Sequence, residues 1–183
     1  MDPGLSKSEL ESRQRAYANE AHLVKIVDRR KFDPSLKPTI VAAPAGYSAG
    51  TVVVDTGHKF LYLVGSDGKA HRYGIAVGAT GHAWSGKAVI GRKAEWPAWY
   101  PTDDMHAQTP QLPRRIEPGQ HNPLGARALY LYQNGVDTLY RIHGTSEPWT
   151  IGTEASSGCI RMLNEDIIDL YDRASNGATV VVL

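Results

Sequence analysis

The chain contains one cysteine, Cys159, and a histidine, His143, stands sixteen positions before it in the segment IHGTSEPWTIGTEASSGCIRM. A thiol is mostly protonated at neutral pH, and it becomes a nucleophile when a nearby imidazole takes its proton. These two residue types therefore indicate acyl-transfer chemistry. A lone cysteine, however, more often packs in a core as a small apolar side chain.

The residues beside the thiol favour catalysis over packing. Gly158 precedes Cys159 and lacks a Cβ, so a substrate carbonyl can approach the backbone N–H groups, which is what an oxyanion hole requires. His143 closes the apolar run TLYRIH, and catalytic groups are often mounted where a rigid element meets loops. Ser156 and Ser157 complete the small, polar frame of the thiol. Both interpretations remain open on these residues alone.

Composition excludes several classes of protein. The 183 residues are 42% hydrophobic and carry a net charge of +1, which predicts one ordinary core with a small appendage. Lys and Arg form no basic stripe, so no nucleic acid partner is expected. No apolar run approaches the ~20 residues of a membrane span. One cysteine excludes an internal disulfide and a zinc site built on several thiolates, and we expect neither a metal nor a cofactor.

The elements that must position these residues are mainly β-strands. Residues 51–78 contain three β-rich runs, and Asp67-Gly68 between two of them favours a tight hairpin. The run RALYLY and the run TLYRIHG flank Asn134-Gly135, a second hairpin signal. One strong helix follows in NEDIIDLYDRASNG, with Asn164 as its expected N-cap, and ATVVVL closes the chain as a strand.

The remainder predicts an N-terminal arm and a long loop. Residues 8 to about 31 lack Gly and Pro, and Ser8 with Glu11 has the form of a capping box, so we expect a helical arm over residues 1–49 that ends in a Pro-containing extended linker. Six of the eleven prolines lie between residues 96 and 124, where nothing is periodic. Such a loop is either a substrate-binding surface or a plain surface insertion.

The segment GHAWSGKA, residues 81–88, nearly matches a phosphate-binding loop. Ala88 replaces the hydroxyl residue that would hold magnesium, and the following AVIG predicts a strand rather than a helix. Nucleotide binding is therefore not expected.

The segment HGTSEPWTIGTEASSGCIRMLNEDIIDLY closely resembles the signature of the L,D-transpeptidases, H-G-T…P…I-G…S-x-G-C-I-R-M-x-N-x-D. The resemblance extends through VVVDTGHKFLYLV, YGIAVGATGHAWSGKAVIGRKAEWPAWYP and NPLGARALYLY, and it covers roughly residues 50–183. It implies a β-sandwich-like catalytic domain over 50–183 that acts in bacterial cell-wall chemistry.

The resemblance also implies roles for individual residues. Cys159 would attack the bond after the third residue of a peptidoglycan tetrapeptide stem, release D-alanine and hold the stem as a thioester. His143 would be the general base and acid, oriented by the backbone carbonyl of Gly144, and the amides of Gly158 and Cys159 would form the oxyanion hole. An amine from a second stem, or from an outer-membrane protein or lipoprotein, would then take the acyl group. The product would be a 3–3 cross-link or an anchored protein.

Other signature positions suggest contacts with the substrate. Ser156, Ser157 and Arg161 lie near the thiol in the signature, and Arg161 is expected to meet a substrate carboxylate or to hold the loop through a salt bridge. The tryptophans Trp96, Trp99 and Trp149 are expected to line the groove or to serve as core. Many relatives have histidine where this chain has Ser157, which we interpret as tolerated variation.

Alternative functions share the same cysteine–histidine pair. A hydrolase of the same family would pass the acyl group to water, and a non-catalytic wall-binding module would not use the pair. A papain-like peptidase places cysteine before histidine, and a sortase separates its residues further and needs a later arginine. Residues 1–17 lack the apolar stretch of a secretory signal, yet the implied substrate lies outside the cytoplasmic membrane. We expect a periplasmic or wall-associated protein.

Overall fold

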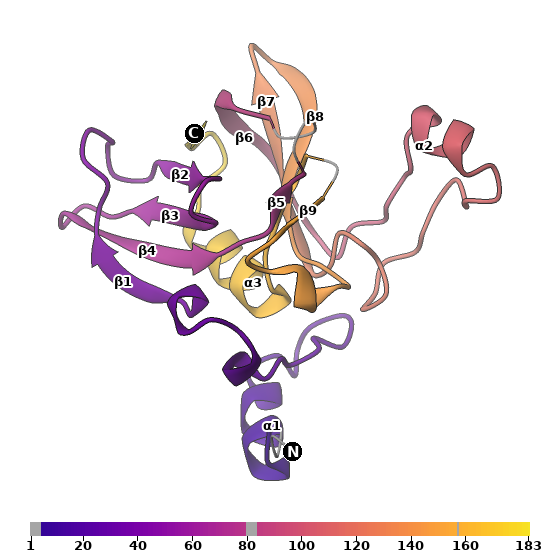
Figure 1. The fold of residues 1–183 in the computed structure, drawn as a ribbon, viewed down its shortest axis with the longest axis horizontal. Helices are drawn as coiled ribbons and strands as arrows, with labels where there is room; N and C mark the ends of the chain where they lie inside the picture. Colours follow the sequence, from indigo (N-terminus) through magenta and orange to yellow (C-terminus); the bar gives the residue numbers. More distant parts are fainter. Residues whose placement is uncertain (1–4, 80–83, 157) are drawn as a thin grey trace.

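The computed structural model describes residues 5–79, 84–156 and 158–183, and β-structure dominates it (Figure 1). Within these residues one mixed sheet has the strand order β1-β4-β3-β2-β11-β6-β7-β8-β10, and β5 pairs with β9 in a second sheet. The strands are β1 (Thr39–Ala42), β2 (Val52–Asp55), β3 (Phe60–Val64), β4 (Lys69–Gly74), β5 (Val77–Gly78), β6 (Gly86–Glu95), β7 (Arg127–Gln133), β8 (Val136–His143), β9 (Glu154–Ser156), β10 (Ile160–Arg161) and β11 (Thr179–Val182). The prediction of a mainly β fold is confirmed.

The two hairpins predicted from turn residues are present. Gly68, between β3 and β4, has φ of +77°, and Asn134 and Gly135, between β7 and β8, have φ of +49° and +75°. Asn and Gly adopt this left-handed region at little cost, which is why they select tight hairpin turns. The segment after the phosphate-loop-like sequence is the strand β6, as predicted, whereas residues 81–83 of that sequence lie outside the described residues.

One core joins the two halves of the large sheet. Val52 and Leu61 from the β2–β3 half belong to the same buried cluster as Leu129 and Ile142 from the β7–β8 half. Ile167 of α3 (Asn164–Arg173) completes it, and Figure 1 shows α3 below the sheet. Apolar faces from both halves thus enclose a single core, the sandwich-like arrangement expected from the sequence.

The late helix is present, but its N-cap differs from the prediction. Leu163 is the N-cap residue of α3, and no side chain caps the helix there. Asn164, the predicted cap, lies inside the first turn, where its carboxamide bonds other segments. No helix in the described part of the chain combines the length and the apolar character that a membrane crossing requires.

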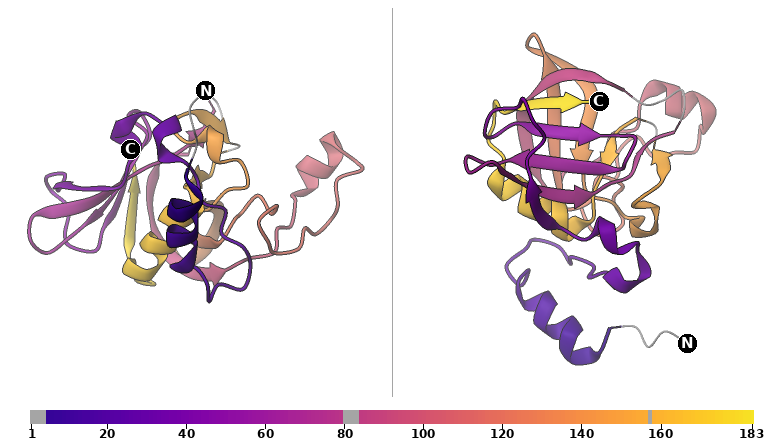
Figure 2. Two further views of the ribbon diagram at one scale, coloured as in Figure 1. Left: turned by 90° about the horizontal axis from the view of Figure 1, so that it is seen from below. Right: turned by 60° about the vertical axis from the view of Figure 1, so that its left-hand side comes forward.

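The arm contains a shorter helix than predicted. α1 (Lys7–Arg15) begins in a capping box of Ser6 and Glu9 rather than Ser8 and Glu11, and it buries no residue. The helix α1 lacks a continuous apolar stripe that could pack against the domain, so packing does not stabilise a helix as far as residue 31. The chain instead runs beneath the domain with Val24 and Ile26 buried (Figures 1 and 2).

Two irregular segments contain structure that the sequence did not reveal. The short 3₁₀ helix η1 (Arg29–Lys31) ends the stretch predicted as helical. The Pro-containing linker that follows includes the 3₁₀ helix η2 (Pro34–Leu36) and the strand β1, which pairs antiparallel with β4. The proline-rich loop carries the short helix α2 (Asp103–Gln108), which projects from the body of the molecule (Figures 1 and 2). At its base Trp99 and Ile116 exchange two backbone hydrogen bonds of 3.0 and 2.8 Å.

Candidate active site

His143 is the last residue of β8 and only 5% of it is exposed. Its ring atom Nδ1 lies 2.5 Å from the carbonyl oxygen of Gly144. A carbonyl oxygen can only accept, so Nδ1 carries the hydrogen and donates it. In the neutral ring Nε2 then keeps its lone pair, and the imidazole can accept a proton there.

Asn164 fixes the turn that follows His143. Its Oδ1 accepts hydrogen bonds from the backbone N–H groups of Ala126, at 3.1 Å, and Thr145, at 3.2 Å, while its Nδ2 donates to the Thr145 carbonyl at 3.0 Å. A Cβ added to Gly144 would collide with Oδ1 of Asn164. Glycine is therefore required at residue 144 by this close approach.

The pairing of β8 with β10 brings the segment that contains Cys159 beside the end of β8 that carries His143. The two strands are parallel, with Ile160 opposite Ile142 and Arg161 opposite His143. Ile142 and Ile160 are buried in the core. Side chains alternate along a strand, so His143 and Arg161 point to the opposite face. Cys159 directly precedes β10, and its thiol receives a backbone hydrogen bond from Arg141.

The electrostatic environment favours the neutral form of each group. Burial lowers the pKa of His143 to about 4, and the positive charges of Arg161 and Arg141 act in the same direction, whereas the bond to Gly144 opposes them. Burial also raises the pKa of the Cys159 thiol, which a backbone hydrogen bond from Arg141 and the charges of Arg141 and Arg161 counteract. Both shifts favour the neutral forms, a thiol and an uncharged imidazole.

A bulge in β8 contributes backbone groups to the thiol. The register of β7 and β8 shifts between Tyr130 and Tyr132, and Leu139 has φ of +67°, an unusual value for a residue other than glycine. The Cys159 thiol donates a weak hydrogen bond, 3.9 Å long, to the Leu139 carbonyl. Strained backbone of this kind often re-aims groups beside an active site.

The glycine before the thiol has a positive φ. Gly158 has φ of +125°, in the region that disfavours residues with a Cβ. Ser156 is the last residue of β9, and Ser157 lies outside the described residues, so the two predicted serine contacts stay predictions.

Arg161 forms the salt bridge that the sequence left open. Its Nη1 lies 2.9 Å from Oε2 of Glu147, and 20% of the Arg161 side chain is exposed. Its charge also acts on His143 and Cys159, so Arg161 belongs to the site electrostatically. A substrate carboxylate at this position would compete with Glu147.

The three tryptophans occupy different environments. Trp149 is 68% exposed in η3 (Pro148–Thr150), two residues after Glu147, so it can contact a substrate. Trp99 is half-buried at the base of the α2 excursion. Trp96 is buried, and its indole N–H donates to Glu20 of the arm at 2.9 Å, so it serves as packing between arm and domain.

Sequence reasoning missed the groups that position the pair. Leu139 acts through its backbone, for which side-chain patterns carry no signal, and Arg141 acts through both its backbone and its charge. Asn164 did carry one, because the signature contains an asparagine at that position, but helix-capping rules suggested a different use. Arg127 also escaped notice, although its carbonyl accepts the N–H of Gly144 at 3.1 Å.

The fold and these residues agree with comparisons to known proteins. The sequence profile of the YkuD L,D-transpeptidase catalytic domain matches residues 49–182, and the chain belongs to this family. A Fuscovulum blasticum protein, named as an L,D-transpeptidase of the ATP synthase subunits region, is 34% identical over 157 residues, which is 85% of this chain and 74% of that protein. The probable L,D-transpeptidase YbiS of Escherichia coli K12 is 39% identical over 101 residues, 53% of this chain.

A solved structure from Brucella melitensis extends the similarity. It is described as a probable carnitine operon oxidoreductase, is 49% identical, and superposes with a TM-score of 0.57 over 85% of this chain and 99% of its own. That description names a different activity from the family's. The match to YbiS covers only 31% of the length of that relative, so the activity of a whole relative does not transfer directly.

Proposed function

We propose that this chain is a cysteine-dependent L,D-transpeptidase that acts on peptidoglycan tetrapeptide stems through a thioester. Cys159 is the nucleophile, and His143 is the general base and acid. The observation that supports the proposal is the hydrogen bond from His143 Nδ1 to the Gly144 carbonyl, because it puts the ring hydrogen on Nδ1 and leaves the basic lone pair on Nε2 for the thiol proton.

Acylation begins from neutral groups. As the thiol attacks the carbonyl carbon after the third stem residue, Nε2 of His143 takes its proton, so charge separates only while the carbon–sulfur bond forms. The N–H groups of Gly158 and Cys159 stabilise the developing oxyanion. The imidazolium then donates its proton to the nitrogen of the leaving D-alanine, and a thioester remains.

Deacylation reverses these roles. His143 takes a proton from an acceptor amine as the amine attacks the thioester carbonyl, and the sulfur leaves and regains the proton. An amine from a second stem gives a 3–3 cross-link, and an amine of an outer-membrane protein or lipoprotein gives an anchored protein. Both acceptors lie outside the cytoplasmic membrane, which favours a periplasmic or wall-associated location.

Substrate contacts follow from exposure and charge. Arg161 offers a guanidinium to a stem carboxylate, and exposed Trp149 offers an aromatic surface close to it in the chain. Trp99 is half-buried at the base of the α2 excursion and can offer part of its ring to the substrate, and Ser156 and Ser157 precede the oxyanion glycine.

Product analysis tests the reaction type. Purified tetrapeptide muropeptides are incubated with the wild-type protein and with Cys159→Ala, alone and with an amine acceptor, and the products are separated by chromatography and mass. Cross-linked dimers or acceptor conjugates that require Cys159 support the proposal. Tripeptides as the sole products would contradict the proposal and favour the hydrolase alternative. Unchanged substrate would favour a non-catalytic wall-binding module.

A further inference from the structure

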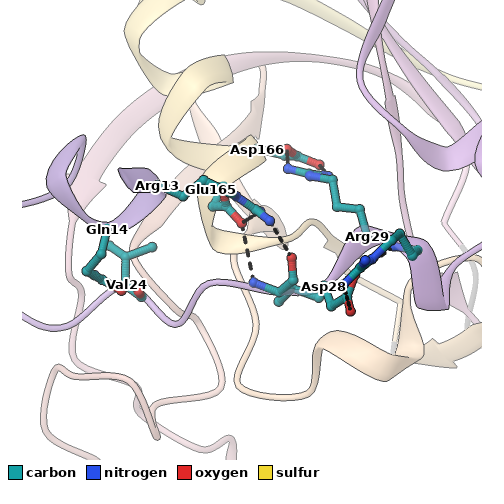
Figure 3. A network of polar contacts seen from close by, with 9 residues as sticks. Arg13, Gln14, Val24, Asp28, Arg29, Glu165 and Asp166 are labelled. Carbon is teal, nitrogen blue, oxygen red and sulfur yellow. Dashed lines mark hydrogen bonds and ion pairs between the residues drawn. The ribbon is translucent and has the colours of Figure 1, made fainter. Parts of the chain in front are cut away.

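The N-terminal arm precedes the matched family region, yet three acid–base pairs fasten it to the domain. Figure 3 shows two of them, Arg13 with Glu165 and Arg29 with Asp166, at the first turn of α3. The third joins Glu20 to Arg127 at the start of β7. The domain partners in these pairs are Glu165, Asp166 and Arg127, and at most 10% of each of their side chains is exposed to solvent.

Glu20 bonds Arg127, a residue whose backbone carbonyl holds the His143–Gly144 turn. Its Oε1 accepts from Arg127 Nη2 at 2.6 Å, and its Oε2 accepts from the Trp96 indole at 2.9 Å. These two bonds lower the pKa of Glu20 against the effect of burial. The Arg127 carbonyl accepts the N–H of Gly144, so the residue that Glu20 holds also holds the turn.

Arg29 and Arg13 bond the first turn of α3, which holds the other side of the His143–Gly144 turn through Asn164. Arg29 forms two hydrogen bonds with the buried carboxylate of Asp166, at 3.2 and 2.5 Å. Arg13 bonds Glu165 at 2.6 Å and the carbonyl of Val27 at 2.9 Å. Their partners directly follow Asn164, whose carboxamide bonds the backbone of Thr145.

Apolar contacts follow the same path. Val24 of the arm packs with Trp96, Ala126 and Ile168 in one buried cluster. Further along, Leu36 approaches Gly74 so closely that a Cβ on that glycine would lie 2.8 Å from the Leu36 Cβ. Residues 13–36 of the arm therefore contact the domain at several points rather than at one.

We propose that residues 13–36 form a positioning clamp for the His143–Gly144 turn, which makes the arm part of the catalytic unit. The clamp acts through Arg127 on one side of the turn and through the first turn of α3 on the other. Removing one charge of such a pair leaves a buried charge without compensation, and the supporting segment must shift to hydrate it. The inference rests on the proposed role of His143.

Point variants of the full chain test the clamp. Glu20→Gln and Arg29→Gln each remove one arm charge, and Arg15→Gln is the matched control, because Arg15 is an exposed arginine on α1 that bonds only the Glu11 carbonyl in the described structure. Arg13→Gln is a milder clamp variant, since 29% of its side chain is exposed. Arg29→Lys keeps the charge and should recover part of the loss.

Two readouts separate positioning from stability. The pKa of His143 can be followed by NMR of its ring in the folded protein. It should rise from about 4 toward 6.5 in Glu20→Gln and Arg29→Gln, because a loosened turn admits water and weakens the effect of burial. The charges of Arg141 and Arg161 continue to oppose this rise. The rate constant for acylation at saturating β-lactam should fall about tenfold or more with little change in apparent affinity. Arg15→Gln should match the wild type in both.

The proposal is overturned if folded clamp variants are less stable but keep the wild-type His143 pKa and acylation rate, because the arm is then a brace only. A variant that does not fold is replaced by Arg13→Gln, which is judged by the same two readouts. Failure of the wild-type protein to acylate at all would refute the proposed function, whereas the His143 titration would still decide the clamp.

Discussion

The Oδ1 atom of Asn164 fills the space into which a side chain on Gly144 would project. The same atom accepts two backbone N–H groups, from Ala126 and Thr145, so it cannot move aside without leaving buried donors unpaired. The Asn164 carboxamide, which belongs to α3, thus holds the backbone of Gly144 in place. The Gly144 carbonyl in turn orients the ring of His143.

Replacing Gly144 by alanine should disable the enzyme. The new methyl group must displace Asn164 or the turn, and either movement shifts the carbonyl that orients His143. We expect a loss of acylation rate of about 100-fold or more, since displacements near 1 Å have such effects. Rapid-quench mass spectrometry measures it. Gly57→Ala is the control, because its Cβ would meet only Asp55 at an ordinary 3.5 Å.

Asn164→Ala should lower stability as well as activity. The change orphans the N–H groups of Ala126 and Thr145 and the carbonyl of Thr145, at roughly 1–3 kcal/mol for each buried group. Urea unfolding of Asn164→Ala and of Asn176→Ala, an exposed asparagine just after α3, measures the difference. Equal midpoints for the two variants would contradict the bracing role of Asn164.

The acid limb of the pH–rate profile should lie far below the usual titration of histidine. His143 must be neutral to accept the thiol proton, and burial lowers its pKa to about 4. The acylation rate constant should therefore stay constant as the pH falls through 6.5 and decline only near pH 4. A limb at or above 6.5 would indicate an imidazolium stabilised by a thiolate in the resting enzyme.

Variants of Arg161 and Glu147 distinguish whether their salt bridge serves substrate binding or only holds the loop. If Arg161 binds a stem carboxylate, Arg161→Gln should raise KM for tetrapeptide stems about tenfold, whereas Glu147→Gln should leave KM unchanged or lower it, because a competitor is removed. Steady-state kinetics of both variants decide the matter. Parallel losses in the two variants would mean that the bridge only holds the loop.

Local sequence signals predicted the parts of this fold that depend on local physics. Asn134-Gly135 predicted its hairpin because few other residues accept positive φ, and the final helix was predicted from the segment NEDIIDLYDRASNG. Cys159 and His143 were singled out by residue chemistry alone. The placement of their segments beside each other required the β8–β10 pairing, which is a long-range property.

Long-range contacts explain what the sequence did not predict. The arm residues 17–28 lack Gly and Pro and favour a helix locally, but burial of Val24 and the Glu20–Arg127 pair hold them against the domain in another conformation. Asn164 has the form of an N-cap, but two donors from the Ala126 and Thr145 backbone compete for its carboxamide. Tertiary contacts outweigh local propensity in both cases.

Covalent labelling tests the central claim, that Cys159 is a nucleophile activated by His143, most directly. The protein is incubated with a carbapenem, whose strained carbonyl mimics an acylating substrate, and its intact mass is compared with those of Cys159→Ala and His143→Gln. We predict one adduct of the carbapenem mass on the wild type, none on Cys159→Ala, and an acylation rate at least about 100-fold lower for His143→Gln. An unmodified wild-type protein, or an adduct that persists in Cys159→Ala, would contradict the account.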